Sequence, residues 1–340
     1  LIAFMGTVGL AIVTLTGVVE VWHVVVFALL GGIARAVQTP AQQAMIPALV
    51  EKDQLLSGMA LSSVSVHGSR LAGPLVGGIL LEVWGAGSVF VLSAILYFGG
   101  AICLWRMRYR NTAPLGTQRL SVARLFSEMG EGARYIGRDR RVALVITLVV
   151  FHCALTMAFD SLIPELAHDL GGGGQLYSAL LMGLGAGAIT GTVGIAKIPT
   201  LAVQGKVLAI CGAASGLSML TLGFAPTPAL AIAGAVIAGG SQASYMALSA
   251  TFVQDMTPDL LRGRVMSLYV MLAAGHMAFV NLGMGALADI VGVRPLLVIP
   301  GLLWTVVFIV GVVSLADMRQ LLRRGTFGTA APAMESVPAS

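Results

Sequence analysis

Apolar stretches of about 20 residues follow one another along almost the whole chain, separated by short polar segments. A helix of that length crosses the hydrocarbon core of a bilayer. Of the 340 residues, 57% are hydrophobic and 10% are charged, whereas a soluble domain has about 25% charged residues. Inside lipid, only helices and closed barrels satisfy every backbone polar group. Because the stretches lack the alternating pattern of barrel strands, the sequence predicts an all-α membrane protein.

The apolar stretches predict ten membrane spans. The chain starts inside the first of them, at Leu1, without the basic segment or cleavage site of a signal peptide. We therefore expect the protein to have further residues before Leu1. The predicted spans are 1–18, 22–49, 55–82, 88–105, 142–165, 176–196, 206–224, 228–254, 265–288 and 295–315.

The basic residues predict the orientation of the spans, since cytoplasmic loops collect Lys and Arg. If the turn at Lys52 is cytoplasmic, 17 of the 20 basic residues lie in cytoplasmic segments and one, Arg294, lies outside. The other two, Arg35 and Arg70, lie within spans. We therefore expect a cytoplasmic C-terminus. The net charge of +5 comes from these loops and requires no nucleic-acid partner.

A long basic loop divides the chain. Within it, Leu125, Met129, Ala133 and Ile136 form one apolar stripe at helical spacing, which predicts an amphipathic helix on the inner membrane surface. The polar tail is expected to be disordered. The predicted parts are an N-terminal group of four helices at 1–105, a cytoplasmic linker at 106–141, a six-helix half at 142–316 and the tail at 317–340.

Two similar turns indicate an internal repeat. The turn that begins at Asp53, with the sequence DQLLSG, resembles the one that begins at Asp259, with the sequence DLLRG. Each turn follows a span that contains a Gly-Gly pair and amide side chains, as expected of two parallel halves. Because the second half has six spans and the first has four, we expect two further spans before Leu1.

Two motifs in the first half carry unusual residues for membrane spans. Arg35-Ala-Val-Gln38 places an arginine at bilayer depth, where charged side chains usually face a protein interior or a water-filled path. Gly73-Pro74-Leu-Val-Gly77-Gly78 leaves one helix face without side-chain bulk, so another helix can pack closely against it. Pro74 removes one backbone hydrogen bond and is expected to bend the span. Ordinary glycine-mediated packing is the alternative to a role in gating.

These motifs resemble those of the major facilitator superfamily over residues 1–317, within the branch of the enterobactin exporter and the macrolide efflux proteins. The first is similar to the RxxQ of the family's fourth helix, with Thr39 in place of the following glycine. The second is similar to the end of the antiporter motif of the fifth helix, with Ser69 in place of an upstream glycine. The segments 47–51 and 257–264 are similar to loop signatures of siderophore exporters.

The resemblance implies a major facilitator fold with two pseudo-symmetric halves and about ten of twelve transmembrane helices present. It implies a monomeric secondary transporter of a bacterial inner or plasma membrane. This transporter would export small amphipathic molecules, drug-like or siderophore-like, by proton antiport with alternating access. Its partners would be the substrate, protons and the lipid bilayer, without nucleic acid or cofactor. In that family Gly73, Pro74, Gly77 and Gly78 would form a gating element.

Polar residues within the spans are the candidates for the transport site, because such residues are costly in lipid. His152, Thr156 and Asp160 follow one another at four-residue steps and suggest a proton site. Each candidate has a structural alternative, as a packing residue or a hydrogen bond between helices. The coupling candidates are Arg35, Gln38, His67, Arg70, His152 and Asp160, and the substrate-cavity candidates are Gln42, Gln242, Tyr245, His276 and Asn281.

Enzyme signatures are absent from this sequence, including a phosphate-binding loop, a nucleophile elbow and a zinc-protease motif. The three cysteines, at 103, 153 and 211, have no disulfide or metal spacing and are interpreted as core residues. We therefore expect no catalytic residues and no metal. The alternatives to an exporter are a lysolipid flippase or importer of the same fold, a non-transporting sensor or scaffold, and a membrane enzyme.

Overall fold

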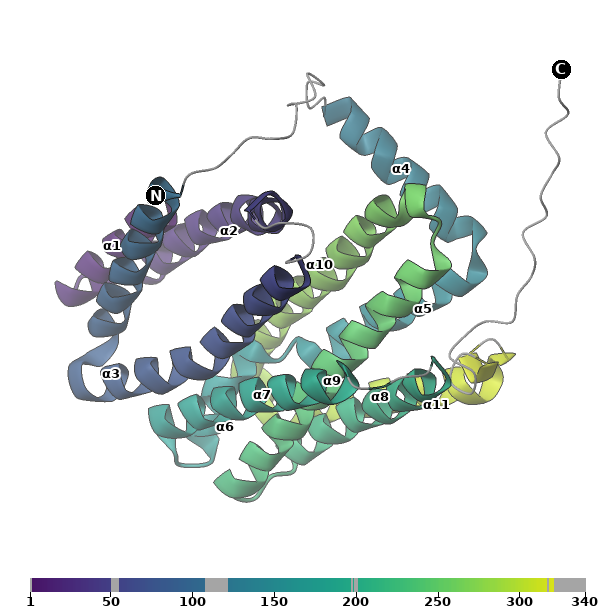
Figure 1. Cartoon of the computed structure of the whole chain (residues 1–340). Helices are drawn as coiled ribbons and strands as arrows, with labels where there is room; N and C mark the ends of the chain where they lie inside the picture. Colours follow the sequence, from purple (N-terminus) through teal and green to yellow (C-terminus); the bar gives the residue numbers. More distant parts are fainter. Residues whose placement is uncertain are drawn as a thin grey trace, which may run out of the picture. The chain divides into compact units, whose positions relative to one another are not determined.

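The computed structural model describes residues 2–49, 55–107, 122–196, 198, 201–316 and 318–320 (Figure 1). Within these ranges every regular element is a helix, so the predicted all-α fold is confirmed. The predicted turn at 51–54, most of the basic loop and the tail from 321 lie outside the described residues.

Helices occur at each of the ten predicted spans. Among the described residues, seven helical segments are long and apolar enough to cross a membrane. They are Val83–Arg106, Arg140–Asp169, Gly173–Ile195, Ala202–Gly223, Pro228–Met256, Leu260–Val291 and Val293–Ser314. Shorter apolar helices occupy Ile2–Leu15, Val21–Ala34 and Ala72–Leu81, at the first three predicted spans.

The chain forms two compact units. Unit 1 comprises Leu1–Arg119 and Ala167–Gly185, and unit 2 comprises Leu120–Leu166 and Ala186–Ser340. The helix α7 (Gly173–Ala196) therefore contributes its first residues to unit 1 and the rest to unit 2.

Unit 1 contains α1 (Ile2–Leu15), α2 (Val21–Leu49) and α3 (Leu55–Arg106). Close contacts at glycines join them: a Cβ at Gly9 would overlap the ring of Phe27 in α2. The long α3 is two helical segments joined at Gly85, where φ is 74° and ψ is 178°. This positive φ favours glycine. The connection predicted as a loop at 83–87 is therefore a sharp change of direction at one glycine (Figure 1).

Unit 2 contains α4 (Val122–Arg138), α5 (Arg140–His152), α8 (Leu201–Gly223), α9 (Pro228–Met256), α10 (Asp259–Val291) and α11 (Val293–Ser314). Small residues allow these helices to approach closely, as is usual in membranes. A Cβ at Gly212 of α8 would overlap the ring of Phe308 in α11. The Trp304 indole N–H donates to the Gly212 carbonyl at 2.7 Å. A Cβ at Gly187 of α7 would overlap the backbone of α9.

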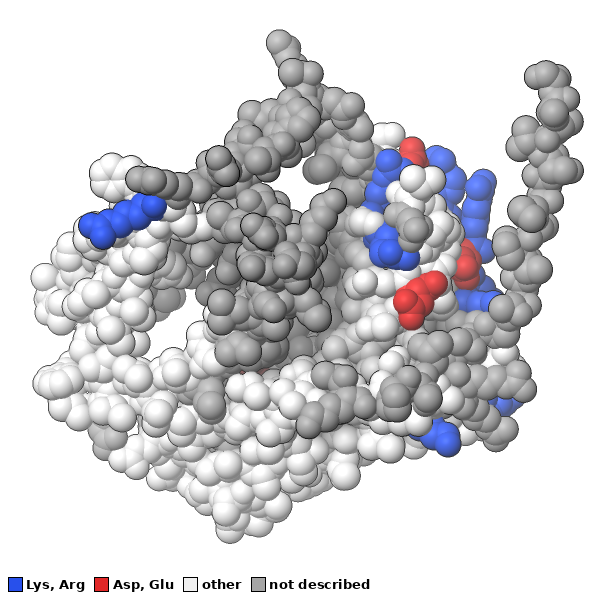
Figure 2. All heavy atoms as spheres, viewed as in Figure 1, with Lys and Arg blue, Asp and Glu red and all other residues white. Residues whose placement is uncertain are grey.

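The helix α4 covers the segment predicted to be amphipathic, and it packs on α10. Glu131 forms an ion pair with Arg264, and the Tyr135 hydroxyl donates to the Met256 carbonyl at 2.9 Å. Burial raises the pKa of Tyr135, and the nearby Asp139 carboxylate raises it further. Basic side chains gather around α4 and the adjoining ends of α5 and α10 (Figure 2). This helix is therefore attached to unit 2 by specific contacts as well as being suited to a membrane surface.

Candidate functional site

The span between Arg140 and Asp169 is interrupted near its middle. The helix α5 ends at His152, a π-helical turn follows at Cys153–Met157, and a 3-10 turn at Asp160–Leu162 leads into α6 (Ile163–Asp169). Between the two turns, Ala158 has the non-helical dihedrals φ −85° and ψ 51°. The expectation of one continuous α-helix over 142–165 is therefore wrong. The nearest local signal is Pro164, the second residue of α6, because a proline inside a helical pattern ends or kinks the helix at the preceding residue.

An amide side chain of α9 satisfies a backbone carbonyl that the interruption frees. The Gln242 side-chain N–H donates to the Thr156 carbonyl at 2.5 Å, and both residues are buried. The Thr156 hydroxyl turns back and donates to the His152 carbonyl at 2.8 Å. A buried carbonyl without a partner would be costly, so Gln242 stabilises the broken segment.

A second amide, on α10, holds the 3-10 turn from the other side. The Ser161 backbone N–H donates to the Asn281 side-chain oxygen at 3.1 Å, and the Ser161 hydroxyl donates to the Asn281 carbonyl at 3.0 Å. Thus two of the predicted cavity residues, Gln242 and Asn281, meet the same interrupted span from different helices. They are interhelical hydrogen-bonding groups in this conformation.

His152 lies in an aromatic enclosure within unit 2. Its side chain is 0% exposed, and its Nε2 is 3.1 Å from the Ser215 hydroxyl. The imidazole stacks on Tyr245 with a centroid distance of 4.2 Å, and Trp304 contacts it edge-on at 5.0 Å. Among the described atoms, Nδ1 of His152 has no hydrogen-bond partner. This enclosure favours a packing role for His152, and for the buried Tyr245, over contact with a substrate.

Asp160 and His276 are exposed. Asp160 is the first residue of the 3-10 turn, so the interruption separates it from His152 and they do not share one continuous helical face. Nδ1 of His276 lies 2.8 Å from the Leu272 carbonyl on its own helix. The structure thus places Asp160 at the broken segment, while proton binding by His152 and Asp160 and substrate contact by His276 stay predictions.

The candidates in the first half lie on α2 and α3. Gln38 is exposed on α2. The backbones of the remaining four belong to these two helices, but their side chains are outside the described part of the structure. They are Arg35, Gln42, His67 and Arg70. Their roles stay predictions.

The glycine-proline motif lies in the first segment of α3, which remains helical through Pro74. A Cβ at Gly78 would overlap the Ser178 side chain of α7, so the two helices approach closely there. At Gly77 the nearest atom is Val89 Cγ1, at 3.9 Å from such a Cβ. At Gly73 no described atom lies within 4 Å. The motif therefore provides one tight helix contact, at Gly78, and its gating role stays a prediction.

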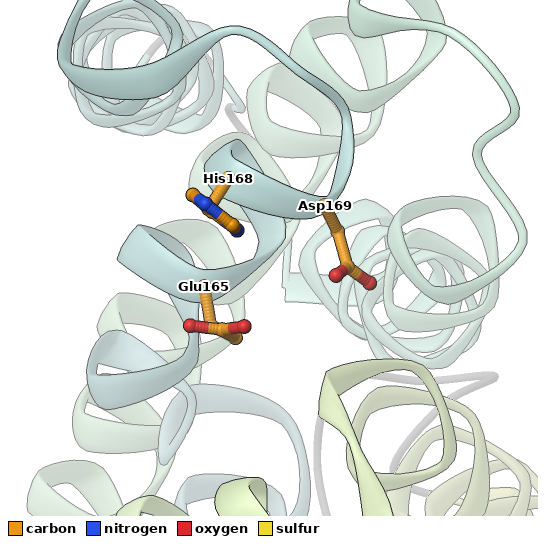
Figure 3. Close-up of side chains that lie close together, drawn as sticks. All are labelled: Glu165, His168 and Asp169. Atoms are coloured by element: carbon orange, nitrogen blue, oxygen red, sulfur yellow. The ribbon is translucent and has the colours of Figure 1, made fainter.

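Three side chains at the end of the interrupted span lie close together on α6 (Figure 3). The potential ligand atoms of Glu165, His168 and Asp169 are all within 4.8 Å of one another. All three side chains are exposed, and they share one short helix. We assign them no ligand, because hydrated acidic and histidine side chains are ordinary at the solvent end of a span.

Several residues that contact the candidate site were not selected from the sequence. Ser161, Ser215, Ser241 and Trp304 contact the candidates or their partners. Serines are frequent in membrane helices, where each can hydrogen-bond to its own helix. No local pattern therefore distinguishes the serines that join two helices from those that do not.

Comparisons with known proteins agree with the fold and with the motif resemblance. A family model described as transmembrane secretion effector matches residues 1–325. The staphyloferrin A transporter of Staphylococcus aureus is 22% identical over 272 residues, which cover 79% of this chain and 66% of that protein. Macrolide efflux protein A of Streptococcus pyogenes is 25% identical over 199 residues, covering 54% of this chain and 48% of that protein. The chain thus spans between about half and two thirds of the length of these relatives.

A solved structure shows the same fold. The crystal structure of a POT family transporter in complex with 5-aminolevulinic acid has a TM-score of 0.65 and 13% sequence identity. The match covers 93% of this chain and 80% of that one. At this identity the similarity concerns the fold alone.

Proposed function

Because this chain belongs to the transmembrane secretion effector family, within the major facilitator superfamily, we propose that it exports small amphipathic molecules from a bacterial cell. We place it in the plasma membrane with its C-terminus in the cytoplasm, as the basic loops suggest. The names of its relatives, a staphyloferrin A transporter and a macrolide efflux protein, support siderophores and drug-like compounds as substrate classes.

The interrupted span is the observation that carries this proposal. Non-helical backbone at membrane depth is tolerated where it is buried in protein or lines a water-filled cavity. Secondary transporters bind substrates and coupling ions at such discontinuous helices, and rocking of their halves exposes the site to either side. The segment from Thr156 to Ser161, held by Gln242 and Asn281, is the proposed substrate-contacting element of unit 2.

We propose inward proton movement as the driving force, with Arg35 and an acidic residue as the coupling groups. A guanidinium stays charged at any relevant pH, so it stabilises the ionised form of a neighbouring carboxylate. Moving the two apart would let that carboxylate take up a proton.

The experiment compares accumulation of staphyloferrin A, a macrolide and a cationic dye in cells with and without the protein, expressed from its gene. An exporter lowers the accumulation of at least one compound, and dissipating the proton gradient abolishes the difference. An importer raises accumulation. A flippase moves a fluorescent lysolipid between leaflets instead, and a sensor or scaffold changes none of these quantities.

The variants Arg35→Ala and Arg35→Lys test the coupling mechanism. Both should reach the membrane in near-normal amounts, yet efflux per folded molecule should fall to the level of cells that lack the protein. Lysine fails because it keeps the charge but loses the planar set of donors. Gln38→Ala, one turn away on α2 and exposed, is the matched comparison and should retain more efflux than either. Normal efflux per molecule in Arg35→Ala would end the coupling role.

A further inference from the structure

A cluster of sulfur atoms lies beside the interruption in unit 2. The Cys153 Sγ is 3.8 Å from the Sδ of Met157 in the same π-helical turn and 3.5 Å from the Sδ of Met246 on α9. Cys153 is 2% exposed, whereas both methionines are partly buried. A thiol has one hydrogen, so it can donate to only one of these thioethers at a time. One thiol thus faces two thioether sulfur atoms, one from its own turn and one from α9.

Contacts from α10 hold this cluster in place. The Tyr269 hydroxyl donates to the Met246 carbonyl at 3.2 Å, and its oxygen is also 3.9 Å from the Met246 Sδ. Tyr269 is itself buried. The sulfur atom of Met246, although it belongs to a flexible side chain, is thus confined between Cys153 and Tyr269.

The two sulfur–sulfur separations from Cys153 are compatible with a trigonal metal site. A first-row metal binds thiolate at about 2.3 Å, so three sulfur atoms in a trigonal plane around it stand about 4.0 Å apart. The two separations measured from Cys153, 3.8 and 3.5 Å, are within about half an ångström of that value. Two ligands on opposite sides of an ion would need about 4.6 Å. Movement of the flexible methionine side chains would bring the two thioethers and the thiol around one ion.

The chemistry of the ligands selects the ion. Thiolate and thioether sulfur are soft ligands that favour Cu(I), whereas Mg²⁺, Ca²⁺ and Mn²⁺ favour oxygen. The total charge of the site also favours Cu(I). One thiolate and one monovalent cation are neutral together, whereas a divalent cation would leave a net charge at membrane depth. We propose that Cys153, Met157 and Met246 form a binding site for Cu(I).

Binding is a ligand exchange without a redox step. The S–H bond of Cys153 breaks, its proton passes to the buffer, and a bond from the thiolate sulfur to Cu(I) forms. The two thioethers add lone pairs and lose no protons. The charge of the site is therefore the same before and after binding. This proposal does not depend on efflux, since occupancy can be measured without transport.

The test is a competition in which the purified protein withdraws Cu(I) from its bicinchoninate complex, without oxygen and in detergent. A background of Cys103→Ser and Cys211→Ser leaves Cys153 as the single cysteine. We expect one Cu(I) per chain and an X-ray absorption spectrum with a first shell of sulfur alone. In that background, Cys153→Ser and Met246→Leu should each weaken the affinity by about tenfold or more. Met219→Leu, a buried methionine of α8, is the matched control and should leave it unchanged.

The outcomes separate a three-sulfur site from other sources of binding. The proposal is overturned if the background protein withdraws no Cu(I), or if nitrogen or oxygen dominates the first shell. It is also overturned if Cys153→Ser binds as tightly as the background, or if the thiol alone accounts for binding and Met246→Leu and Met157→Leu change nothing. If Cys153→Ser fails to fold, the two leucine variants, which conserve volume, decide the question.

Discussion

Two membrane helices of this protein are interrupted in different ways. The helix α3 carries Pro74 but keeps helical dihedrals there, and it breaks once, at Gly85, where the positive φ favours glycine. The span from Arg140 to Asp169 breaks at 153–162, just before Pro164. At Gly85 the break results from the backbone conformation of the glycine itself. In the second span the neighbouring helices also take part, because Gln242 and Asn281 satisfy backbone groups that the break frees.

The comparison shows that the stability of an interrupted membrane helix depends on which groups form hydrogen bonds with its unpaired backbone N–H and C=O groups. A proline removes a single N–H group, and a helix tolerates this when adjacent turns adjust. An unwound segment frees several groups at once, and each would cost about 1–3 kcal/mol if it stayed buried without a partner. We therefore expect substitutions at the amide partners to matter more than substitution of the proline.

The largest effect is expected from Gln242→Leu. This change leaves the buried Thr156 carbonyl without its donor, and it should lower the free energy of unfolding by about 2 kcal/mol. Reversible unfolding in mixed detergent micelles measures the change. The control is Gln254→Leu, an exposed glutamine on the same helix, which should be nearly neutral. Equal stability of the two variants would mean that Gln242 does not support the interruption.

An intermediate effect is expected from Gly78→Ala, which puts a methyl group where α3 meets Ser178 of α7. Overpacking of this kind should cost about 1–2 kcal/mol. The second change Ser178→Gly in the same chain should restore most of the loss, because it removes the overlapping atoms. Gly73→Ala serves as the control, since no described atom lies within 4 Å of the added methyl group. An equal loss for both alanine variants would contradict the tight contact at Gly78.

The smallest effect on stability is expected from Pro74→Ala, within about 0.5 kcal/mol of the parent protein. The regained N–H can complete the helix, and the loss of ring contacts offsets part of that gain. If the motif acts as a pivot, efflux per folded molecule should nevertheless fall. A large loss of stability in the same unfolding measurement would show that the proline, rather than the glycines, organises this part of α3.

The helices and their approximate ends could be predicted because lipid requires about 20 apolar residues per span, a property of each segment by itself. The predicted span at 228–254 corresponds to α9, and that at 295–315 corresponds to α11. The joint at Gly85 and the interruption after His152 were not predicted. The first has Gly85 as its local signal, and the second has Pro164, which lies just after the interrupted segment and was not used.

The candidate site shows the same division. Polar residues such as Gln242 and Asn281 could be selected from the sequence because their burial in lipid needs a reason. Their partners in the interrupted span could not be predicted, because these lie far away along the chain. Thr156 is 86 residues from Gln242, and Ser161 is 120 residues from Asn281. Similarly, the sequence places His152 and Asp160 on one polar stripe of a helix. The structure shows that the π-helical turn after His152 breaks this stripe.

The sequence by itself determined that this is a helical membrane protein of the major facilitator type, because hydropathy and short motifs are local properties that lipid and close helix packing impose. The tertiary structure alone decided that Ser215, Tyr245 and Trp304 enclose His152, and that Cys153 and Met246 bring their sulfur atoms within 3.5 Å. These contacts join different helices, and their geometry depends on helix rotation and on where each helix departs from regularity. Neither quantity is encoded in the order of residues within any single span.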